Sequence, residues 1–338
     1  MYDFVSFEIK KAKELGEVPV KLLESFRNLT QRGKGVRSGL ICLGYRACGG
    51  KDIEEITKTS IFMEIFHSGI LVHDDFMDRD DLRRGFPTLH KEFETVGKNL
   101  GVTMPLDHYG NSVAVCLGDV AFYLSWKILI NSKFPKDFVS EAANIYCDHI
   151  VRVGLGQALD LTVTDVSKRN EKDLLSVLLT KSVEYTSSAP LLIGAALAGE
   201  TNKKKLKALE NYAKCFGWAF QIQDDLLGMF GTEEELGKPI GSDLREGKNT
   251  LLMLYLSKMG TRKHLKIQKE LMGKENVTGE DVMKMREILK ESGAYDYVKN
   301  MGLKYLKEGR TYIPIITKDE NLREIFDSLI TYVMERSK

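Results

Sequence analysis

Residues 53–78 read IEEITKTSIFMEIFHSGILVHDDFMD, and this stretch indicates how the chain folds. From Ile53 to Met77 its apolar residues recur at three- and four-residue spacing, which is the period of an α-helix. The run ends in three aspartates, Asp74, Asp75 and Asp78. Asp74 and Asp78 are four residues apart, so on a helix they project from one face. The stretch therefore predicts a long apolar helix whose end carries clustered carboxylates.

The same helical period runs through most of the chain. It recurs over Val113–Asn131, Phe138–Leu161 and Lys203–Gly231, and few segments alternate with the period of a strand. Glycine-, proline- or polar-rich breaks separate the helical runs at Arg32–Gly35, Gly49–Asp52, Arg83–Thr88, Gly97–Asn111, Asn131–Lys136, Gly199–Lys203 and Gly231–Gly247. We expect an all-α bundle of about ten or more helices, formed as a single domain over residues 1–338.

Composition excludes several classes of protein. The 338 residues include 49 Lys and Arg and 48 Asp and Glu, so no basic excess is available to bind nucleic acid. Five scattered cysteines predict neither a disulfide framework nor a zinc site. The N-terminus lacks an apolar signal segment, and apolar stretches such as Ala189–Gly199 are shorter than the roughly 20 residues of a membrane span. We therefore expect a cytoplasmic protein without a membrane span.

A second acidic cluster, Asp224-Asp225-Leu226-Leu227-Gly228, ends another apolar run. Carboxylates gathered on apolar helices are costly unless a cation lies beside them. Carboxylate oxygens suit Mg²⁺, which commonly joins one or two carboxylates to phosphate groups. A helix end that merely happens to be acidic would explain one such cluster equally well, but two clusters weaken that alternative.

Cationic residues accompany both clusters. They are Arg83 and Arg84 after the first cluster, Lys34 and Arg37 on an upstream loop, Lys181 at the start of an apolar run, and Lys238 and Lys248 after the second cluster. Arginine suits bidentate contact with phosphate, and lysine supplies a mobile point charge. A solvated surface charge would explain any one of the lysines. Taken together, the carboxylates and cations indicate a diphosphate site.

Several stretches resemble the motifs of short-chain trans-isoprenyl diphosphate synthases of the farnesyl/geranylgeranyl type. They are RGKGVRS (32–38), HSGILVHDDFMDRDDLRRGFPTLH (67–90), YGNSVAVCLGD (109–119), GQALDL (156–161), TKSVEYTSSAPLLIGAALAG (180–199), FQIQDDLLGMFG (220–231) and GKPIGSDLREGKNTLL (237–252). They follow the family order, and the first aspartate-rich region with its LRRG is the most specific. The resemblance implies an isoprenoid synthase-like helical bundle around a central cavity, with the two aspartate-rich helices facing each other.

The resemblance also implies a head-to-tail condensation of isopentenyl diphosphate with allylic prenyl diphosphates, carried out by a homodimer. Mg²⁺, about three ions per active site, would be held by Asp74, Asp78 and Asp224, and Asp75, Asp225 and Lys181 would complete the catalytic set. The allylic diphosphate would be bound by Arg83, Lys181, Ser182, Gln221, Lys238 and Lys248. Isopentenyl diphosphate would be bound by Lys34, Arg37, His67 and Arg84.

Three positions depart from the family pattern. Gly228 replaces a third aspartate in the second cluster, and we expect activity to survive this change. Gly35 and Ser38 stand where many members have Arg and Pro, so we expect a more mobile loop here.

Product length is predicted from one face of the first acidic helix. Phe66, Gly69 and His73 share that face. In farnesyl-type relatives an aromatic residue at the place of Gly69 or Ile70 blocks the growing chain, so Gly69 should open that level. Phe66 lies one turn deeper, about 5.4 Å, which is comparable to one C5 unit. We predict a C20 product, geranylgeranyl diphosphate, with Phe66 as the floor; a plain core role for Phe66 is the alternative.

Other activities remain open at this point. Farnesyl (C15) or geranylfarnesyl (C25) diphosphate is the alternative product. A terpene cyclase of the same fold usually has a different second metal motif and does not need Lys34, Arg37 and His67. A non-catalytic partner subunit of a heteromeric synthase typically loses one acidic cluster, whereas both are present in this chain.

Overall fold

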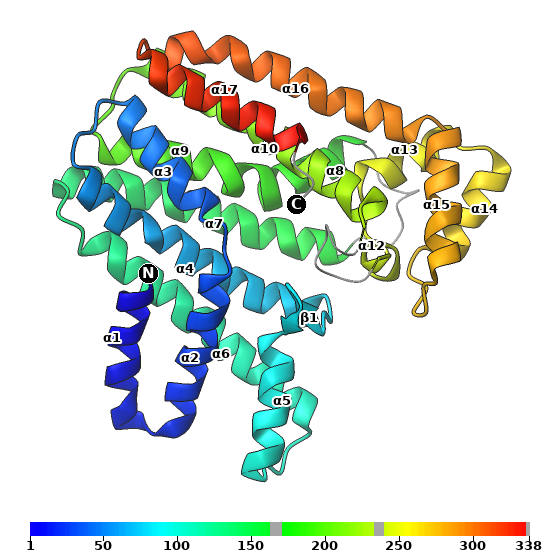
Figure 1. The fold of residues 1–338 in the computed structure, drawn as a ribbon, viewed down its shortest axis with the longest axis horizontal. Coiled ribbons are helices and arrows are strands. Elements are labelled where there is room, and N and C mark those ends of the chain that lie inside the picture. The colour runs from blue at the N-terminus through cyan, green and yellow to red at the C-terminus, as the bar shows by residue number, and fades with distance from the viewer. Residues whose placement is uncertain (163–170, 233–239, 336–338) are drawn as a thin grey trace. The chain divides into compact units, whose positions relative to one another are not determined.

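The computed structural model describes residues 1–162, 171–232 and 240–335 (Figure 1). Its helices and strands are α1 (Tyr2–Ala12), η1 (Lys13–Leu15), α2 (Glu17–Gln31), α3 (Val36–Ala47), α4 (Ile53–Met77), β1 (Leu82–Arg83), β2 (Phe86–Pro87), α5 (Leu89–Leu100), α6 (Leu106–Ile130), α7 (Lys136–Thr162), α8 (Glu171–Leu178), η3 (Leu179–Ser188), α9 (Ala189–Leu197), α10 (Lys203–Phe230), α12 (Ser242–Arg245), α13 (Leu251–Met259), α14 (Arg262–Leu271), α15 (Gly279–Glu291), α16 (Ala294–Ile316) and α17 (Glu320–Glu335). Within the described ranges the only strands are one antiparallel pair, β1 and β2. The all-α prediction is confirmed.

The chain divides into two compact units, which we describe one at a time. Unit 1 comprises Met1–Cys42 and Lys51–Val139, and unit 2 comprises Leu43–Gly50 and Ser140–Lys338. The first acidic cluster belongs to unit 1 and the second to unit 2. The single-domain organisation stays a prediction.

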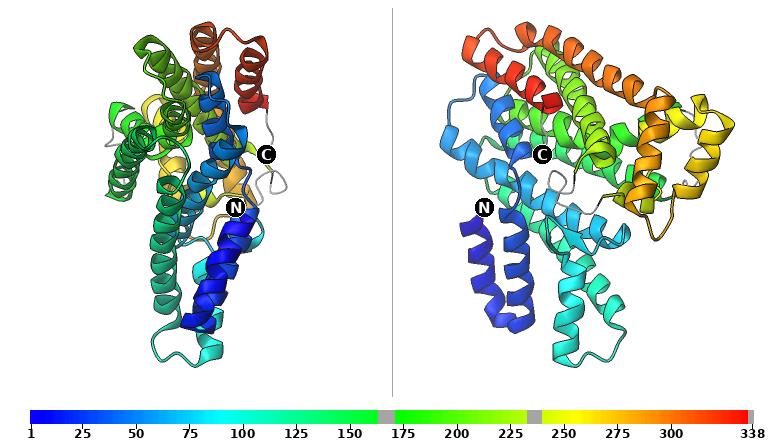
Figure 2. Two further views of the ribbon diagram at one scale, coloured as in Figure 1. Left: turned by 90° about the vertical axis from the view of Figure 1, so that its left-hand side faces the viewer. Right: turned by 45° about the vertical axis from the view of Figure 1, so that its right-hand side comes forward.

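Unit 1 is built on the packing of α4 against α6. Asp52 caps α4 by accepting a hydrogen bond from the Glu55 backbone N–H at 2.9 Å, which satisfies one of the helix's open donors. The apolar face of α4 contributes the fully buried Ile65 and Val72 to a core shared with Leu117 of α6. Helices α1 and α2 lie side by side and join this core (Figure 2). Burial of this face fixes which side chains of α4 remain available at its acidic end.

Helix α6 begins earlier than the sequence pattern indicated. Its first residue is Leu106, directly after Pro105, whereas a break was expected as far as Asn111. It is the one described helix long and apolar enough to cross a membrane, although about a third of its most apolar window is buried in the protein. The expectation that the apolar stretches are too short to span a membrane did not take this helix into account. A single helix of this kind is weak evidence for a span, since core helices of soluble proteins have the same character.

Unit 2 is organised around α10, which packs against α16, α17 and η3. The Tyr212 hydroxyl of α10 donates to the Phe326 carbonyl of α17 at 2.7 Å. At the other end of α10, Arg286 of α15 donates to the carbonyls of Met229 and Gly231. A guanidinium at a helix C-terminus satisfies open carbonyls and complements the helix dipole. These contacts hold the last turns of α10, which carry the second acidic cluster.

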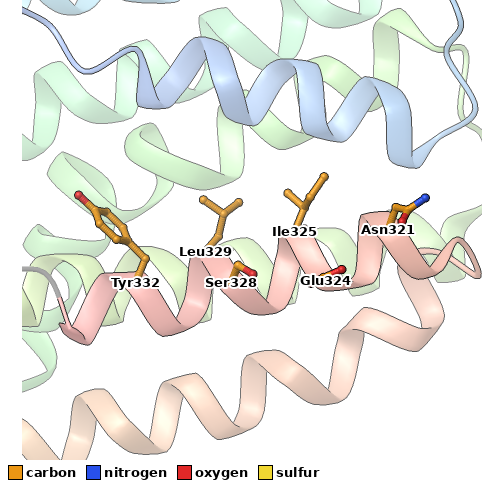
Figure 3. Close-up of a pocket in the computed structure, with 6 residues that line it drawn as sticks. All are labelled: Asn321, Glu324, Ile325, Ser328, Leu329 and Tyr332. Carbon is orange, nitrogen blue, oxygen red and sulfur yellow. The ribbon is translucent and has the colours of Figure 1, made fainter.

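A pocket of about 570 Å³ lies along α17 (Figure 3). Its lining residues are Asn321, Glu324, Ile325, Ser328, Leu329 and Tyr332. These residues include a carboxylate and no Lys or Arg, so this pocket has nothing to neutralise a diphosphate. This pocket is therefore not a candidate diphosphate site.

Candidate active site

The first cluster occupies the last turn of α4. The backbone N–H of Asp78 donates to the Asp74 carbonyl at 2.8 Å, so the helical spacing of these two residues holds to the end of the helix. Both side chains are half-buried, whereas Asp75 is only 2 % exposed. As predicted, Asp74 and Asp78 lie on one face of the helix, and Asp75 projects toward the protein interior.

Asp75 is paired with Arg83 from the hairpin that follows. The Nε of Arg83 donates to Oδ1 of Asp75, and Nη2 of Arg83 lies 3.7 Å from Oδ2 of Asp80. Burial raises the pKa of Asp75 to about 7, although Arg83 acts in the opposite direction. The pair therefore holds Arg83 where the charge of Asp74 also acts on it.

Arg84 lies in a strained turn. It and Gly85 connect the two strands, and their φ angles are +53° and +77°. Two positive φ values are the geometry of a type I′ hairpin turn, which matches the twist of paired strands. A non-glycine residue there costs roughly 1–3 kcal/mol and such strain is concentrated at functional sites. The turn places Arg84 at the tip of the hairpin, directly after Arg83.

Arg37 and Arg84 lie close enough to His67 in unit 1 for their charges to act on it. Burial, followed by the charges of Arg37 and Arg84, lowers the pKa of the His67 imidazole well below its usual value, so His67 is neutral at physiological pH. Lys34, on the loop before α3, is exposed. Of the residues predicted to bind isopentenyl diphosphate, the structure brings three into one electrostatic environment.

Two hydrogen bonds of Ser38 join the start of α3 to α4. Before them, Gly35 has a φ of +67°, a conformation that favours glycine. The Ser38 backbone N–H donates to Oε1 of Glu64 at 2.9 Å, and its hydroxyl donates to the Ser60 carbonyl at 2.8 Å. A proline at 38 could make neither bond. Ser38 is therefore tied to α4, and the mobility of the loop stays a prediction.

In unit 2, Lys181 and Ser182 lie in η3, a π-helical segment. Such segments are rare and often occur at functional sites. The Nζ of Lys181 donates to Oδ2 of Asp160 on α7 at 2.9 Å. Gly156 allows this approach, because a Cβ there would lie 2.7 Å from Oγ1 of Thr180. Sequence reasoning missed Asp160; the motif GQALDL contained it, but its pairing depends on how α7 packs.

The second cluster lies near the end of α10. Ile222, Leu226 and Met229 bury the apolar face of this helix, which leaves Asp224 exposed and Asp225 2 % exposed. Gln221 donates through Nε2 to Oδ1 of Asp225 at 2.9 Å. Burial raises the pKa of Asp225 to about 7, and Lys248 acts against this rise. Lys248 is exposed, whereas Lys238 lies outside the described residues.

Of the residues predicted to set product length, Gly69 does not lie as expected. Gly69 packs directly against α6: a Cβ there would lie 2.8 Å from Cβ of Ala121 and 3.1 Å from Cε1 of Phe122. The prediction that Gly69 opens space at its level is therefore wrong, because α6 fills that space. Phe66 is 1 % exposed and its ring packs on Phe122, with centroids 4.8 Å apart. Ile70 is half-buried.

Among the residues that the structure describes, no three His, Cys, Asp or Glu side chains gather closely enough to hold a metal ion. Each acidic cluster instead combines a buried carboxylate with partly or fully exposed ones. The described part of the chain thus carries two acidic clusters. Cations lie near each cluster, and Lys181 lies in the π-helical segment.

The model of the family described as polyprenyl synthetase matches residues 19–289. A short chain isoprenyl diphosphate synthase of Methanocaldococcus jannaschii is 32 % identical over 90 % of this chain and 85 % of its own. A geranylgeranyl diphosphate synthase of Sulfolobus acidocaldarius is 30 % identical over 89 % of this chain and 86 % of its own. Other relatives include geranylfarnesyl diphosphate synthases.

A solved structure shows the same fold. The geranylgeranyl pyrophosphate synthase of Corynebacterium glutamicum, complexed with isoprenyl diphosphate and magnesium, has a TM-score of 0.91 and 26 % identity, and the match covers 99 % of this chain and 97 % of that one. The chain therefore belongs to the polyprenyl synthetase family, as its aspartate-rich motifs predicted, and is an enzyme of the prenyltransferase class.

Proposed function

We propose that this enzyme condenses isopentenyl diphosphate with allylic prenyl diphosphates and ends at geranylgeranyl diphosphate (C20). The observation that carries the condensation is the group of Arg37, His67 and Arg84 in unit 1, in the same unit as the acidic end of α4. Two guanidinium groups beside a neutral imidazole suit one diphosphate, and carboxylates suit the metal that accompanies a second diphosphate. Relatives named geranylgeranyl diphosphate synthases support the C20 product.

The donor set fits a divalent cation. Oδ2 of the buried Asp225 has no hydrogen-bond partner within the described ranges, and a buried carboxylate oxygen of this kind is stabilised by a cation. Asp74, Asp78 and Asp224 would hold Mg²⁺, about three ions, which when bound would offset charge on the departing diphosphate.

Side chains of the protein would bind and orient the two substrates. Arg83, Lys181, Ser182, Gln221, Lys238 and Lys248 would bind the allylic diphosphate and place positive charge where its C–O bond breaks. Asp75 would position Arg83, and Asp160 would position Lys181, through the pairs described above. Lys34, Arg37, neutral His67 and Arg84 would orient isopentenyl diphosphate, whose double bond attacks the allylic cation. Tyr185, which is buried, and Phe220 would line the cavity beside that cation.

Replacing Arg84 with methionine should raise KM for isopentenyl diphosphate by about 10- to 100-fold, because a charge-assisted hydrogen bond contributes roughly 1.5–3 kcal/mol. At saturating isopentenyl diphosphate, kcat should change little. Steady-state kinetics measure both values. Arg79→Met is the matched control, since Arg79 lies on the same segment with a φ of +58°. An unchanged KM in Arg84→Met would remove Arg84 from the binding site.

Replacing Phe66 with alanine should lengthen the product beyond C20, because it removes the ring that packs on Phe122 at this depth of α4. Chromatography of the dephosphorylated products measures the length. Phe93→Ala is the control: Phe93 is equally buried, but on α5, so the variant should lose a similar stability, about 3–5 kcal/mol, with no change in product. Unchanged product length in Phe66→Ala would make Phe66 plain core.

The C15 and C25 products are the alternatives that the same chromatography distinguishes. A homodimer and a cytoplasmic location are also part of the proposal. Exposed apolar side chains on α6, including Val115, Tyr123 and Ile130, support self-association. The five free cysteines are consistent with a reducing compartment.

A further inference from the structure

The last turn of α10, which follows the second acidic cluster, is held by an arginine of α15. Nε of Arg286 donates to the Met229 carbonyl at 2.7 Å, and its Nη2 donates to the Gly231 carbonyl at 2.6 Å. A planar guanidinium that donates two hydrogen bonds at once fixes both the distance and the direction of the groups that it contacts. Arg286 lies outside all the stretches that carry the family resemblance, which end at residue 252.

Phe230, between these two residues, is contacted by the same pair of helices. Lys290 lies four residues after Arg286 and so shares its face of α15. The Nζ of Lys290 lies 5.7 Å from the centroid of the Phe230 ring, within the range of a cation–π interaction. Tyr295, at the start of α16, meets the same ring edge-on, with centroids 4.8 Å apart. Three consecutive residues at the end of α10 are therefore each in contact with α15 or α16.

Helix α15 and the residues before it also contact α12, from which the chain continues to Lys248. The Gly273 N–H donates to the Leu244 carbonyl of α12 at 2.7 Å. The backbone of Gly241 lies directly against α15, where a Cβ built on it would be 2.9 Å from Cγ2 of Val282. The same part of unit 2 thus contacts two segments that carry residues proposed for the allylic diphosphate, namely the end of α10 and the chain that leads to Lys248.

The end of α10 has no positive charge of its own. Its last turn contains no Lys or Arg. The C-terminus of a helix carries partial negative charge and open carbonyls, both of which a cation offsets. Asp224 and Asp225 add further negative charge one turn earlier. Arg286 therefore supplies the positive charge that this end of the helix lacks, in addition to its two hydrogen bonds.

We propose that Arg286 is a positioning residue for the reaction. By holding the end of α10, it keeps Asp224 and Asp225 in the arrangement that binds the allylic diphosphate. It acts through the two backbone carbonyls and does not touch the substrate. The inference deepens the proposed function, on which it rests.

The test uses a thiolo analogue of geranyl diphosphate, which does not ionise, and measures its binding by calorimetry with Mg²⁺ present. Arg286→Met removes both hydrogen bonds and should weaken binding by about tenfold, as loss of a group that orients ligand-binding residues does. Arg286→Lys keeps the charge, but one ammonium cannot replace the planar pair of donors, so binding should weaken by about threefold. In the condensation, Arg286→Met should raise KM for the allylic diphosphate and leave KM for isopentenyl diphosphate within about twofold of the parent.

Tyr212→Phe is the matched control, because it removes the hydrogen bond from the Tyr212 hydroxyl to the Phe326 carbonyl, earlier on α10. It should lower the temperature of thermal unfolding and leave binding of the analogue as in the parent. The inference is overturned if either Arg286 variant folds and binds the analogue like the parent, or if Tyr212→Phe weakens binding as much as Arg286→Met. It is also overturned if Arg286→Lys does not fold, since Arg286 would then act on stability alone.

The same measurements separate this inference from the proposed function. A parent that binds the analogue but does not condense isopentenyl diphosphate would overturn only the proposed function. A parent that does not bind the analogue would overturn both.

Discussion

Replacing Arg83 with methionine should lower the free energy of unfolding by about 3–5 kcal/mol, because it leaves a buried charge without its partner. Asp75 is 2 % exposed, and Arg83 provides the guanidinium that donates to it. The loss should appear in urea unfolding followed by circular dichroism. Lys58→Met is the control on α4, the helix that carries Asp75. It breaks the exposed Lys58–Glu54 pair, which contributes at most about 1 kcal/mol to stability.

The pH dependence of this variant has a definite sign. The folded-state pKa of Asp75 is raised to about 7 by burial even with Arg83 present, and Arg83 lowers it. Without Arg83 the pKa rises further, so the folded state must keep a proton that the unfolded state releases. Stability is therefore retained at low pH and lost as the pH rises. The destabilisation should be larger at pH 8 than at pH 6.

A second substitution separates stability from catalysis. Arg83→Met/Asp75→Leu replaces the buried pair with apolar groups, which is often neutral or stabilising. It should regain the stability of the parent and still fail to condense substrates, since no guanidinium remains for the allylic diphosphate. Recovery of activity together with stability would show that Arg83 acts only as a structural partner of Asp75.

Asp224→Asn is expected to lower kcat by about 10²–10³-fold, as loss of one preorganised electrostatic group does. Asp224 is exposed at the end of α10, so its removal should cost little stability. KM for isopentenyl diphosphate should stay the same, because the residues proposed to bind it are Lys34, Arg37, His67 and Arg84, and Asp224 is not among them. Steady-state kinetics with each substrate varied in turn separate the two effects.

Glu210→Gln is the matched control for this variant. Glu210 lies on the same helix and pairs with Lys207 and Lys214, far along the chain from the acidic cluster. Its kinetics should equal those of the parent. A parent-like kcat in Asp224→Asn would mean that the second cluster does not take part in the reaction.

The long helices were predictable because their apolar residues repeat with the helical period over many turns. The predicted run from Ile53 to Met77 is α4 to the residue, and Lys203–Gly231 is α10 with one residue fewer. The end of α4 was also predictable, because Asp74 and Asp78 need only a helix to share a face. The start of α6 was not predictable, because polar residues between Pro105 and Asn111 suggested a loop, although they form a helical turn.

What the sequence could not predict depends on contacts between helices. Gly69 permits a close approach of α6, but a glycine in the sequence does not distinguish close packing from an open cavity. Likewise, nothing in the local pattern indicates that the carboxylate of Asp243 packs against Gly228. The pairs Lys181–Asp160 and Ser38–Glu64 join residues far apart in the sequence, and nothing in their local patterns connects them.

The most direct test is the dependence of diphosphate release on isopentenyl diphosphate. The purified protein is incubated with Mg²⁺ and an allylic diphosphate, with and without isopentenyl diphosphate, and released inorganic diphosphate is measured. We expect release only when isopentenyl diphosphate is present, with one diphosphate formed for each C5 unit added. Release at the same rate without isopentenyl diphosphate would contradict condensation and indicate a cyclase, and no release under either condition would indicate a non-catalytic subunit.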